Sequence, residues 1–318
     1  MKAVIKKFVP RSARKWYSDQ RRHQVARREY RLDRRRYMRA AAPPDSAVAF
    51  GVTGRQLETQ LTKDYHRVEK GLALAAPKAQ FGAAVSRRLE SLIPVARREQ
   101  LVGAHVGYAD DARTALTSWN TEAVRAEVVS PLGADLTHHD LTTDEVTRFF
   151  ESRRSIRDFD SSRKVPREVL LHAATLAGHT PSVCNRQSWT AHFFDDPEQV
   201  RRVLKFQNGN RGFAEQVPCV AVVTVDSRLF AGVEERNQPH IEGGLFAMSL
   251  VHALHGLGVG TCMLNMSVRN DRADRLRAAI GLQEHDQVIL MVALGYPAPG
   301  FRVARSPRRT TDEIAVIH

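Results

Sequence analysis

The most constraining feature of this sequence is EGGLFAMSLVHALHGLG at 242–258, which is apolar on nearly every side of a helix. A helix with one solvated face carries an apolar stripe and a polar face, so a helix that is apolar all round must be buried in a core or a subunit interface. Two other runs, VPCVAVVTVD at 217–226 and HDQVILMVALGYP at 285–297, have the length and composition of buried strands. Helices interleaved with a few strands predict an α+β layered domain.

Helix signals mark where this layered domain begins. In TTDEVTRFFESRRS at 142–155, Thr143 is a candidate N-cap and acidic residues follow it in the first turn. Pro166 opens a second helix that Gly178 closes. The loop HTPSVCNRQSW leads into a strand, TAHFFDD at 190–196, and a short helix is followed by the polar loop QNGNRGF at 207–213. This pattern predicts a domain over 142–318.

The positive charge of the chain is concentrated at its N-terminus. Residues 1–39 contain fifteen Lys or Arg against three acidic residues, and the rest of the chain is nearly balanced. No Gly or Pro lies between Arg11 and Ala42, so this segment predicts a helix that ends at Pro43 and Pro44. The sequence therefore predicts a basic helical arm over 1–42.

Aromatic and basic side chains follow separate lines along this arm. Trp16, His23, Tyr30 and Tyr37 recur every seven residues, and Arg14, Arg21, Arg28 and Arg35 do the same on roughly the opposite face. Two interpretations are open. Either the arm docks on an anionic surface such as nucleic acid or lipid headgroups, or its aromatic edge packs on the protein or a partner subunit and its arginines are solvated.

Residues 43–141 are predicted to form a helical extension. Three helical segments occur within 53–130, punctuated by glycines and Pro77, and SPLGADLTHHDL at 130–141 has the composition of a linker. His66 and Glu69 lie one turn apart, but no second such pair accompanies them, and HHD in the linker lies in a loop. We therefore expect no metal site.

Composition also suggests a cellular setting. No run reaches the roughly 18 apolar residues that span a bilayer, and the N-terminus has no apolar signal-peptide core. The three cysteines are far apart and odd in number, which does not suit a disulfide framework. We expect a cytoplasmic protein.

One arginine-rich stretch predicts an anion site. RRSIRDFD at 153–160 places three arginines and a serine within five positions, and guanidinium forks match phosphate oxygens. In contrast, GLGVG at 256–260 follows a helix instead of a strand, so it does not fit a Rossmann dinucleotide loop. No nucleophile or acid–base dyad is evident, so any chemistry must come from a cofactor.

Together, four stretches resemble the FMN-dependent nitroreductase family, in the order in which that family carries them. They are RRSIRDFD, PSVCNRQSWTAHFF, GGLFAMSLVHALHGLGVGTCMLN, and ALGYP followed by SPRR. The resemblance covers roughly residues 143–314. It implies a layered fold with a mainly antiparallel central sheet flanked by helices, and a homodimer with two FMN sites at its interface.

The same resemblance implies which residues hold FMN. Arg153 and Ser155 would bind the phosphate and ribityl end with Arg154 nearby, and Arg157 would lie at the pyrimidine edge of the flavin. Asn185 would pair with that edge, since an amide both donates and accepts.

Further candidates come from the segment that crosses the ring and from the tail. Met263, Leu264 and Asn265 match the crossing segment, and Arg308 or Arg309 would complete the phosphate clamp. In the loop at 207–213, the candidates for contact with substrate are Asn210, Arg211 and Phe213.

Two positions depart from the family pattern. Ser188 stands where the family usually has proline, and Asn265 with Met266 stand where many members have Glu-Gly. The phosphate clamp is intact, so the implied cofactor is unaffected, but the substrate is not defined.

The resemblance implies an FMN-dependent oxidoreductase. NAD(P)H would deliver hydride and then be replaced by an acceptor, which is a nitro compound, a quinone or a more specialised small molecule. A branch that dehalogenates, desaturates or fragments its substrate is left open. The alternative is a flavin-fold scaffold whose basic arm binds nucleic acid or an anionic membrane.

The stretch YHRVEKGLALAAPKAQFG also resembles an extension of nitroreductase-like proteins from polysaccharide gene clusters.

Overall fold

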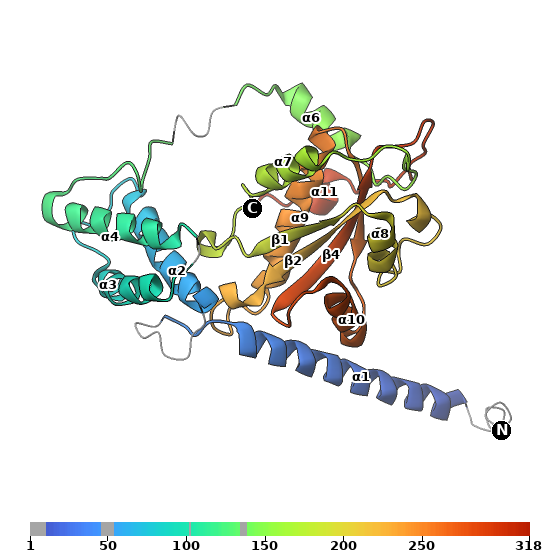
Figure 1. Ribbon diagram of the computed structural model, residues 1–318, viewed down its shortest axis with the longest axis horizontal. Coiled ribbons are helices and arrows are strands. Elements are labelled where there is room, and N and C mark those ends of the chain that lie inside the picture. Colours follow the sequence, from blue (N-terminus) through green and yellow to red (C-terminus); the bar gives the residue numbers. More distant parts are fainter. Residues whose placement is uncertain (1–10, 46–53, 102, 134–138) are drawn as a thin grey trace. The chain divides into compact units, whose positions relative to one another are not determined.

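The computed structural model describes residues 11–45, 54–101, 103–133 and 139–318 (Figure 1). By their contacts they form two compact units, and each is described by itself. The helical unit contains the chain up to Ser130 together with two later segments, 226–239 and 267–287. The sheet unit contains 131–225, 240–266 and 288–318. The boundaries predicted for the arm, the extension and the layered domain stay a prediction.

The sheet unit is built on four strands in the order β1-β2-β4-β3. Their bounds are β1 Trp189–Phe194, β2 Cys219–Asp226, β3 Gly260–Asn265 and β4 Asp286–Gly295. β1 pairs antiparallel with β2, and β3 pairs antiparallel with β4. β3 is therefore an edge strand of the sheet, and this edge carries the candidate site. The predicted α+β class is confirmed.

Two helices pack on this sheet and form its main core (Figure 1). They are α7, Arg167–Ala177, and α9, Gln238–Gly256. Leu250 and Leu254 of α9 are fully buried against alternate residues of β2 such as Ala221 and Val223. The prediction that the apolar stretch 242–258 is a buried helix holds for this side of α9. Ile241 and Leu245, at its other side, are about half exposed.

Shorter elements complete the sheet unit. They are α6 Thr143–Ser152, α8 Pro197–Leu204, α11 Thr311–Ile314, and 3₁₀ turns at Val183–Asn185 and Ala214–Gln216. The N-cap of α6 is Thr142, one residue before the predicted Thr143. Its hydroxyl accepts from the Glu145 backbone N–H, and the Glu145 carboxylate accepts from the Thr142 backbone N–H at 2.9 Å. This reciprocal capping box requires Glu145 at the third helical position, which moves the start of α6 back by one residue.

Three helices of the helical unit form a bundle: α2 Gly54–Leu72, α3 Ala83–Arg98 and α4 His105–Glu122. Leu57, Leu61, Leu89 and Leu116 are fully buried in its core. The buried Asp64 carboxylate accepts from Arg88 at 2.6 Å and from Arg67 at 2.9 Å, so this charge is paired on two sides. His66 and Glu69 form a hydrogen bond with each other at 2.9 Å.

The predicted arm is a single helix, α1, Arg11–Ala40. It ends before Pro43, as predicted, and Ala42 then pairs with Ala231. Of the predicted aromatic edge, Tyr37 donates its hydroxyl to the Gly232 carbonyl at 2.7 Å, whereas Trp16 and Tyr30 are exposed. The side chain of Arg14 and all of residues 1–10 lie outside the described part.

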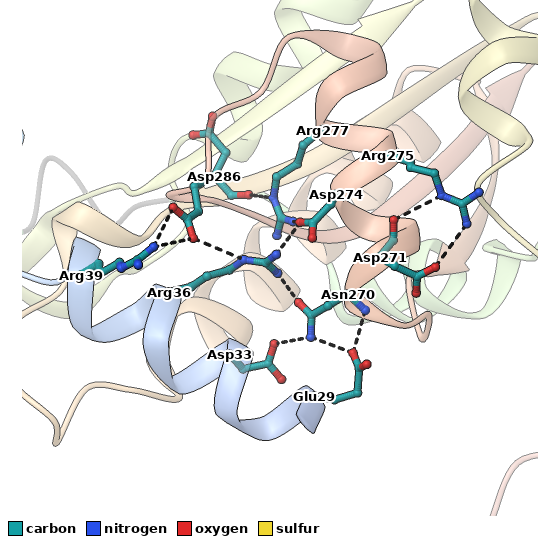
Figure 2. Close-up of polar contacts among 11 residues, drawn as sticks. Glu29, Asp33, Arg36, Arg39, Asn270, Asp271, Asp274, Arg275, Arg277 and Asp286 are labelled. Carbon is teal, nitrogen blue, oxygen red and sulfur yellow. Dashed lines mark hydrogen bonds and ion pairs between the residues drawn. The ribbon is translucent and has the colours of Figure 1, made fainter. Parts of the chain in front are cut away.

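The C-terminal half of α1 is anchored on α10, Asn270–Ile280 (Figure 2). Glu29 accepts from the Asn270 backbone N–H at 2.8 Å, which satisfies one of the free N–H groups at the start of α10. Arg36 donates to the Asn270 side chain and forms an ion pair with Asp274 at 2.5 Å. The sequence did not predict this pairing of the N-terminal helix with a segment 240 residues later.

No helix among the described residues is long and apolar enough to cross a membrane.

Candidate functional site

The predicted anion-binding stretch continues directly from α6 and leaves the helix in extended conformation. Ser155 forms a parallel bridge with Thr261 of β3, and the Ile156 N–H donates to the Thr261 carbonyl at 2.9 Å. Phe159 then bridges Pro297, just beyond the end of β4. The segment therefore lies beside the edge of the sheet. Two stretches that are more than 100 residues apart in the sequence, RRSIR and GTCMLN, are neighbours in the fold.

Two of the three arginines lie close enough to β3 for their charges to act on Cys262. Burial raises the pKa of the Cys262 thiol, and the charges of Arg157 and Arg153 oppose that rise. Arg157 is exposed and Arg153 is half-buried. Both guanidinium groups therefore act on the start of β3 from the adjacent segment.

Arg154 has a different structural role. Its guanidinium donates to the carbonyls of Glu151 and Arg153, so it caps the C-terminal end of α6. A basic side chain at this end is favoured by the helix dipole. That Arg154 also lies near a bound anion stays a prediction.

Two histidines of α9 lie close enough to Arg153 for its charge to lower their pKa values. Burial is the main cause that lowers the pKa of His252, followed by the positive charge of Arg153. Burial and Arg153 also lower the pKa of His255, whose Nε2 lies 2.8 Å from the Ser152 hydroxyl. A lowered pKa favours the uncharged form of each imidazole.

The C-terminal half of β3 exposes alternate side chains, because successive side chains of a strand point to opposite faces of the sheet. Met263 and Asn265 face outward, with Met263 37% exposed, whereas Leu264 is buried. Of the three residues predicted to cross a flavin ring, two side chains are therefore accessible, and Leu264 can contribute only its backbone. The Asn265 carbonyl accepts from Gln207 Nε2 at 2.8 Å, so the loop at 207–213 is attached to the end of β3.

In that loop, the three residues predicted to contact substrate differ in their exposure. Asn210 is buried and donates its amide to the Leu204 carbonyl at 2.8 Å, and Phe213 is buried as well. Arg211 is exposed. Their contact with substrate stays a prediction, but only Arg211 is accessible in this conformation.

The loop that contains Asn185 has an unusual backbone. Cys184, Asn185 and Gln187 all have positive φ, at 50°, 54° and 47°. For residues other than glycine this left-handed region is sparsely populated and must be supported by the surroundings. The Asn185 side chain is exposed.

The support comes from Glu242 near the start of α9. This carboxylate is only 2% exposed, and it accepts from the Val183 N–H at 2.8 Å and from the Ser188 hydroxyl at 3.0 Å. Proline, which the family usually has at this position, has no hydroxyl and could not donate to Glu242. The hydrogen bond to Glu242 therefore explains the serine at position 188. The sequence contained one signal for Glu242, a lone acid at the start of an otherwise apolar helix.

The predicted tail arginine lies in an exposed segment. Arg308 donates to the Ser306 carbonyl at 2.5 Å, within the tail itself. Both Arg308 and Arg309 are exposed, so the choice between them for a phosphate clamp stays a prediction.

Known proteins resemble this part of the chain. The model of the nitroreductase family matches residues 150–209 and 198–296, a region that includes the arginine segment, the Asn185 loop and β3. The predicted nitroreductase resemblance of the C-terminal half is confirmed.

Relatives of this nitroreductase-like half include proteins named iodotyrosine deiodinase. Iodotyrosine deiodinase 1 of Rattus norvegicus is 25% identical over 208 residues, which are 55% of this chain and 70% of the relative. Iodotyrosine deiodinase of Haliscomenobacter hydrossis is 25% identical over 202 residues, 55% of this chain and 89% of that protein. An FMN-dependent nitroreductase structure from Clostridium difficile is 18% identical, covers 54% of this chain and 99% of its own, and has a TM-score of 0.47.

Proposed function

We propose that the C-terminal half is an FMN-dependent oxidoreductase that binds the cofactor beside the edge strand β3. The observation that carries this proposal is the bridge between Ser155 and Thr261, which brings the arginine segment next to the exposed positions of β3. A cofactor with a phosphate at one end and a planar ring at the other needs both features in one place.

The residues present fit FMN. Arg153 and Ser155 offer a charged fork and a hydroxyl for the phosphate end, and charge-assisted hydrogen bonds of this kind are among the stronger ones in proteins. Arg157 and the amide of Asn185 would bind the pyrimidine edge of the ring. Met263, the backbone of Leu264, and Asn265 would lie along the ring, and Arg308 would close the clamp from the tail.

FMN, when bound, would accept hydride from NAD(P)H and pass electrons to a second substrate. The protein would orient the reactants and stabilise negative charge through Arg157. Because reductant and acceptor would use the same open face in turn, we infer ping-pong kinetics. The deiodinases among the relatives support including a halogenated phenol among the acceptors, beside nitro compounds and quinones.

We further propose a cytoplasmic homodimer. Its interface would cover the exposed side of α9, where Ile241 and Leu245 are 54% and 46% exposed although the helix is apolar all round. A face of this composition is typically buried in an assembly.

Anaerobic titration of the FMN-reconstituted protein tests the proposal. NADH or NADPH should bleach the flavin absorbance, and subsequent addition of a nitroaromatic, a quinone or 3-iodotyrosine should restore it if that compound is an acceptor. Protein that retains no flavin after gel filtration would refute the proposal.

A further inference from the structure

The side chains of α1 are sorted by charge around the helix. Glu29 and Asp33 both accept from the Asn270 side-chain amide at 2.9 Å, so both acids lie on the side of α1 that is docked on α10 (Figure 2). Arg36, on the same side, pairs with Asp274. Two acidic side chains of α1, Glu29 and Asp33, are therefore engaged in hydrogen bonds with α10.

The opposite side of α1 is basic. At 100° per residue its centre lies more than a third of a turn from Glu29 and Asp33. Six exposed arginines lie there, and within the described part of the chain none of them forms an ion pair. We call this set the arginine face: Arg21, Arg27, Arg28, Arg31, Arg34 and Arg35. Four of the six lie with Leu32, Met38 and Arg39 on one continuous surface of α1.

The arc that the six arginines span at 100° per residue also contains two exposed aromatic side chains, Trp16 and Tyr17, and Tyr30 lies just outside it. Trp16, Tyr17 and Tyr30 are 65%, 67% and 75% exposed. A helix that lies in a membrane interface has an apolar face separate from its charged face, and α1 has no such face. Aromatic rings interspersed with arginines are typical of surfaces that hold a nucleic-acid backbone and stack on its bases.

We propose that the arginine face of α1 binds nucleic acid through its phosphate backbone. The described side chains from Lys15 to Ala40 cover about 39 Å of helix at 1.5 Å per residue. This is close to the roughly 34 Å length of one duplex turn. Forked guanidinium groups suit phosphate better than ammonium groups do, and the only lysine among these side chains is Lys15. This proposal does not depend on the proposed flavin chemistry.

Fluorescence anisotropy of the full-length protein tests the proposal with labelled 30-mer single-stranded and duplex DNA of random sequence. Measured from 50 to 250 mM salt, the log–log slope of affinity should be on the order of −5 if the six arginines each neutralise one phosphate. The triple variant R28Q/R31Q/R35Q should reduce the slope by about 3 and weaken binding at 150 mM salt at least tenfold. Glutamine has a helix propensity close to that of arginine, so α1 should persist, which far-UV circular dichroism checks.

A control variant with the same loss of positive charge tests whether the effect is specific to α1. R87Q/R201Q/R202Q removes three exposed arginines elsewhere and changes net charge equally, so its affinity should stay within twofold of wild type. Equal losses in the two variants would overturn the proposal, because only net charge would then matter. Tighter binding to phosphatidylglycerol vesicles than to either DNA at 150 mM salt would also overturn it, in favour of a membrane partner.

Discussion

The carboxylate of Glu242 accepts a hydrogen bond from the hydroxyl of Ser188 at 3.0 Å, and both side chains are buried. This contact, with the one from the Val183 N–H, holds a loop in which three residues other than glycine have positive φ. The loop presents Asn185, so a residue on α9 determines the position of a candidate cofactor ligand.

Replacing Glu242 should therefore affect both stability and cofactor binding. Glu242→Ala leaves the Val183 N–H without its acceptor, which should lower the free energy of unfolding by about 1–3 kcal/mol. Glu242→Gln keeps one acceptor oxygen and should lose less. Urea unfolding and FMN equilibrium binding measure the two effects. Glu168→Gln, at an exposed position of α7, is the control and should change neither. Unchanged FMN affinity in Glu242→Ala would argue against a role for this loop in the site.

The two arginines beside β3 should contribute separately to FMN retention. Arg153→Gln and Arg157→Gln should each weaken FMN binding by roughly ten- to a hundredfold, since a hydrogen bond to a charged group contributes about 1.5–3 kcal/mol. Flavin fluorescence titration gives the dissociation constants. Arg167→Gln, exposed at the start of α7, should bind FMN as the wild type does. If all three variants retained FMN equally, the phosphate would have to bind elsewhere.

Gly260 permits the close contact between the arginine segment and β3. A Cβ at this position would lie 2.9 Å from Ile156 and 3.2 Å from the Gly295 carbonyl oxygen. Gly260→Ala should therefore destabilise the fold by about 1–3 kcal/mol, the usual cost of overpacking. Gly244→Ala in α9 meets no atom within 4 Å and should instead stabilise the helix by about 0.5–1 kcal/mol. Thermal unfolding of the two variants should show shifts of opposite sign, and a stabilised Gly260→Ala protein would contradict the contact.

Acid should weaken the anchoring of α1 through Glu29. The hydrogen bond from the Asn270 backbone is the main cause that lowers the pKa of this carboxyl group below its usual 4.5. A lowered folded-state pKa means that the stabilisation is fully present above about pH 4.5 and is lost as pH falls through the folded-state value. The side chain is only partly buried, so the effect after solvent screening is only about 0.5 kcal/mol.

Hydrogen exchange of the α1 backbone at pH 6 and pH 3.5 measures this effect. Wild-type residues 29–40 should lose more protection at pH 3.5 than the same residues of Glu29→Gln, once intrinsic exchange rates are corrected. Asp19, on the same helix but away from α10, supplies the control Asp19→Asn, which should behave as wild type. An identical pH response of wild type and Glu29→Gln would rule out Glu29 as the titrating group.

The sequence alone determined the fold class, the position of most elements and the candidate ligands. The apolar runs at 217–226 and 285–297 indicated buried strands, and 242–258 indicated a buried helix, which holds for one side of α9, because periodicity is a property of neighbouring residues. The motif order also led to the nitroreductase resemblance, and Pro43 and Pro44 correctly placed the end of α1.

Only the tertiary structure decided which of these residues lie in contact with one another. The bridge of Ser155 with Thr261, the support of the Asn185 loop by Glu242, and the capping of α10 by Glu29 each join positions 50 to 240 residues apart. Such pairings depend on how elements pack, and no local pattern encodes them. For the same reason, the buried states of Asn210 and Leu264 became apparent only once the loop and the edge strand had been placed.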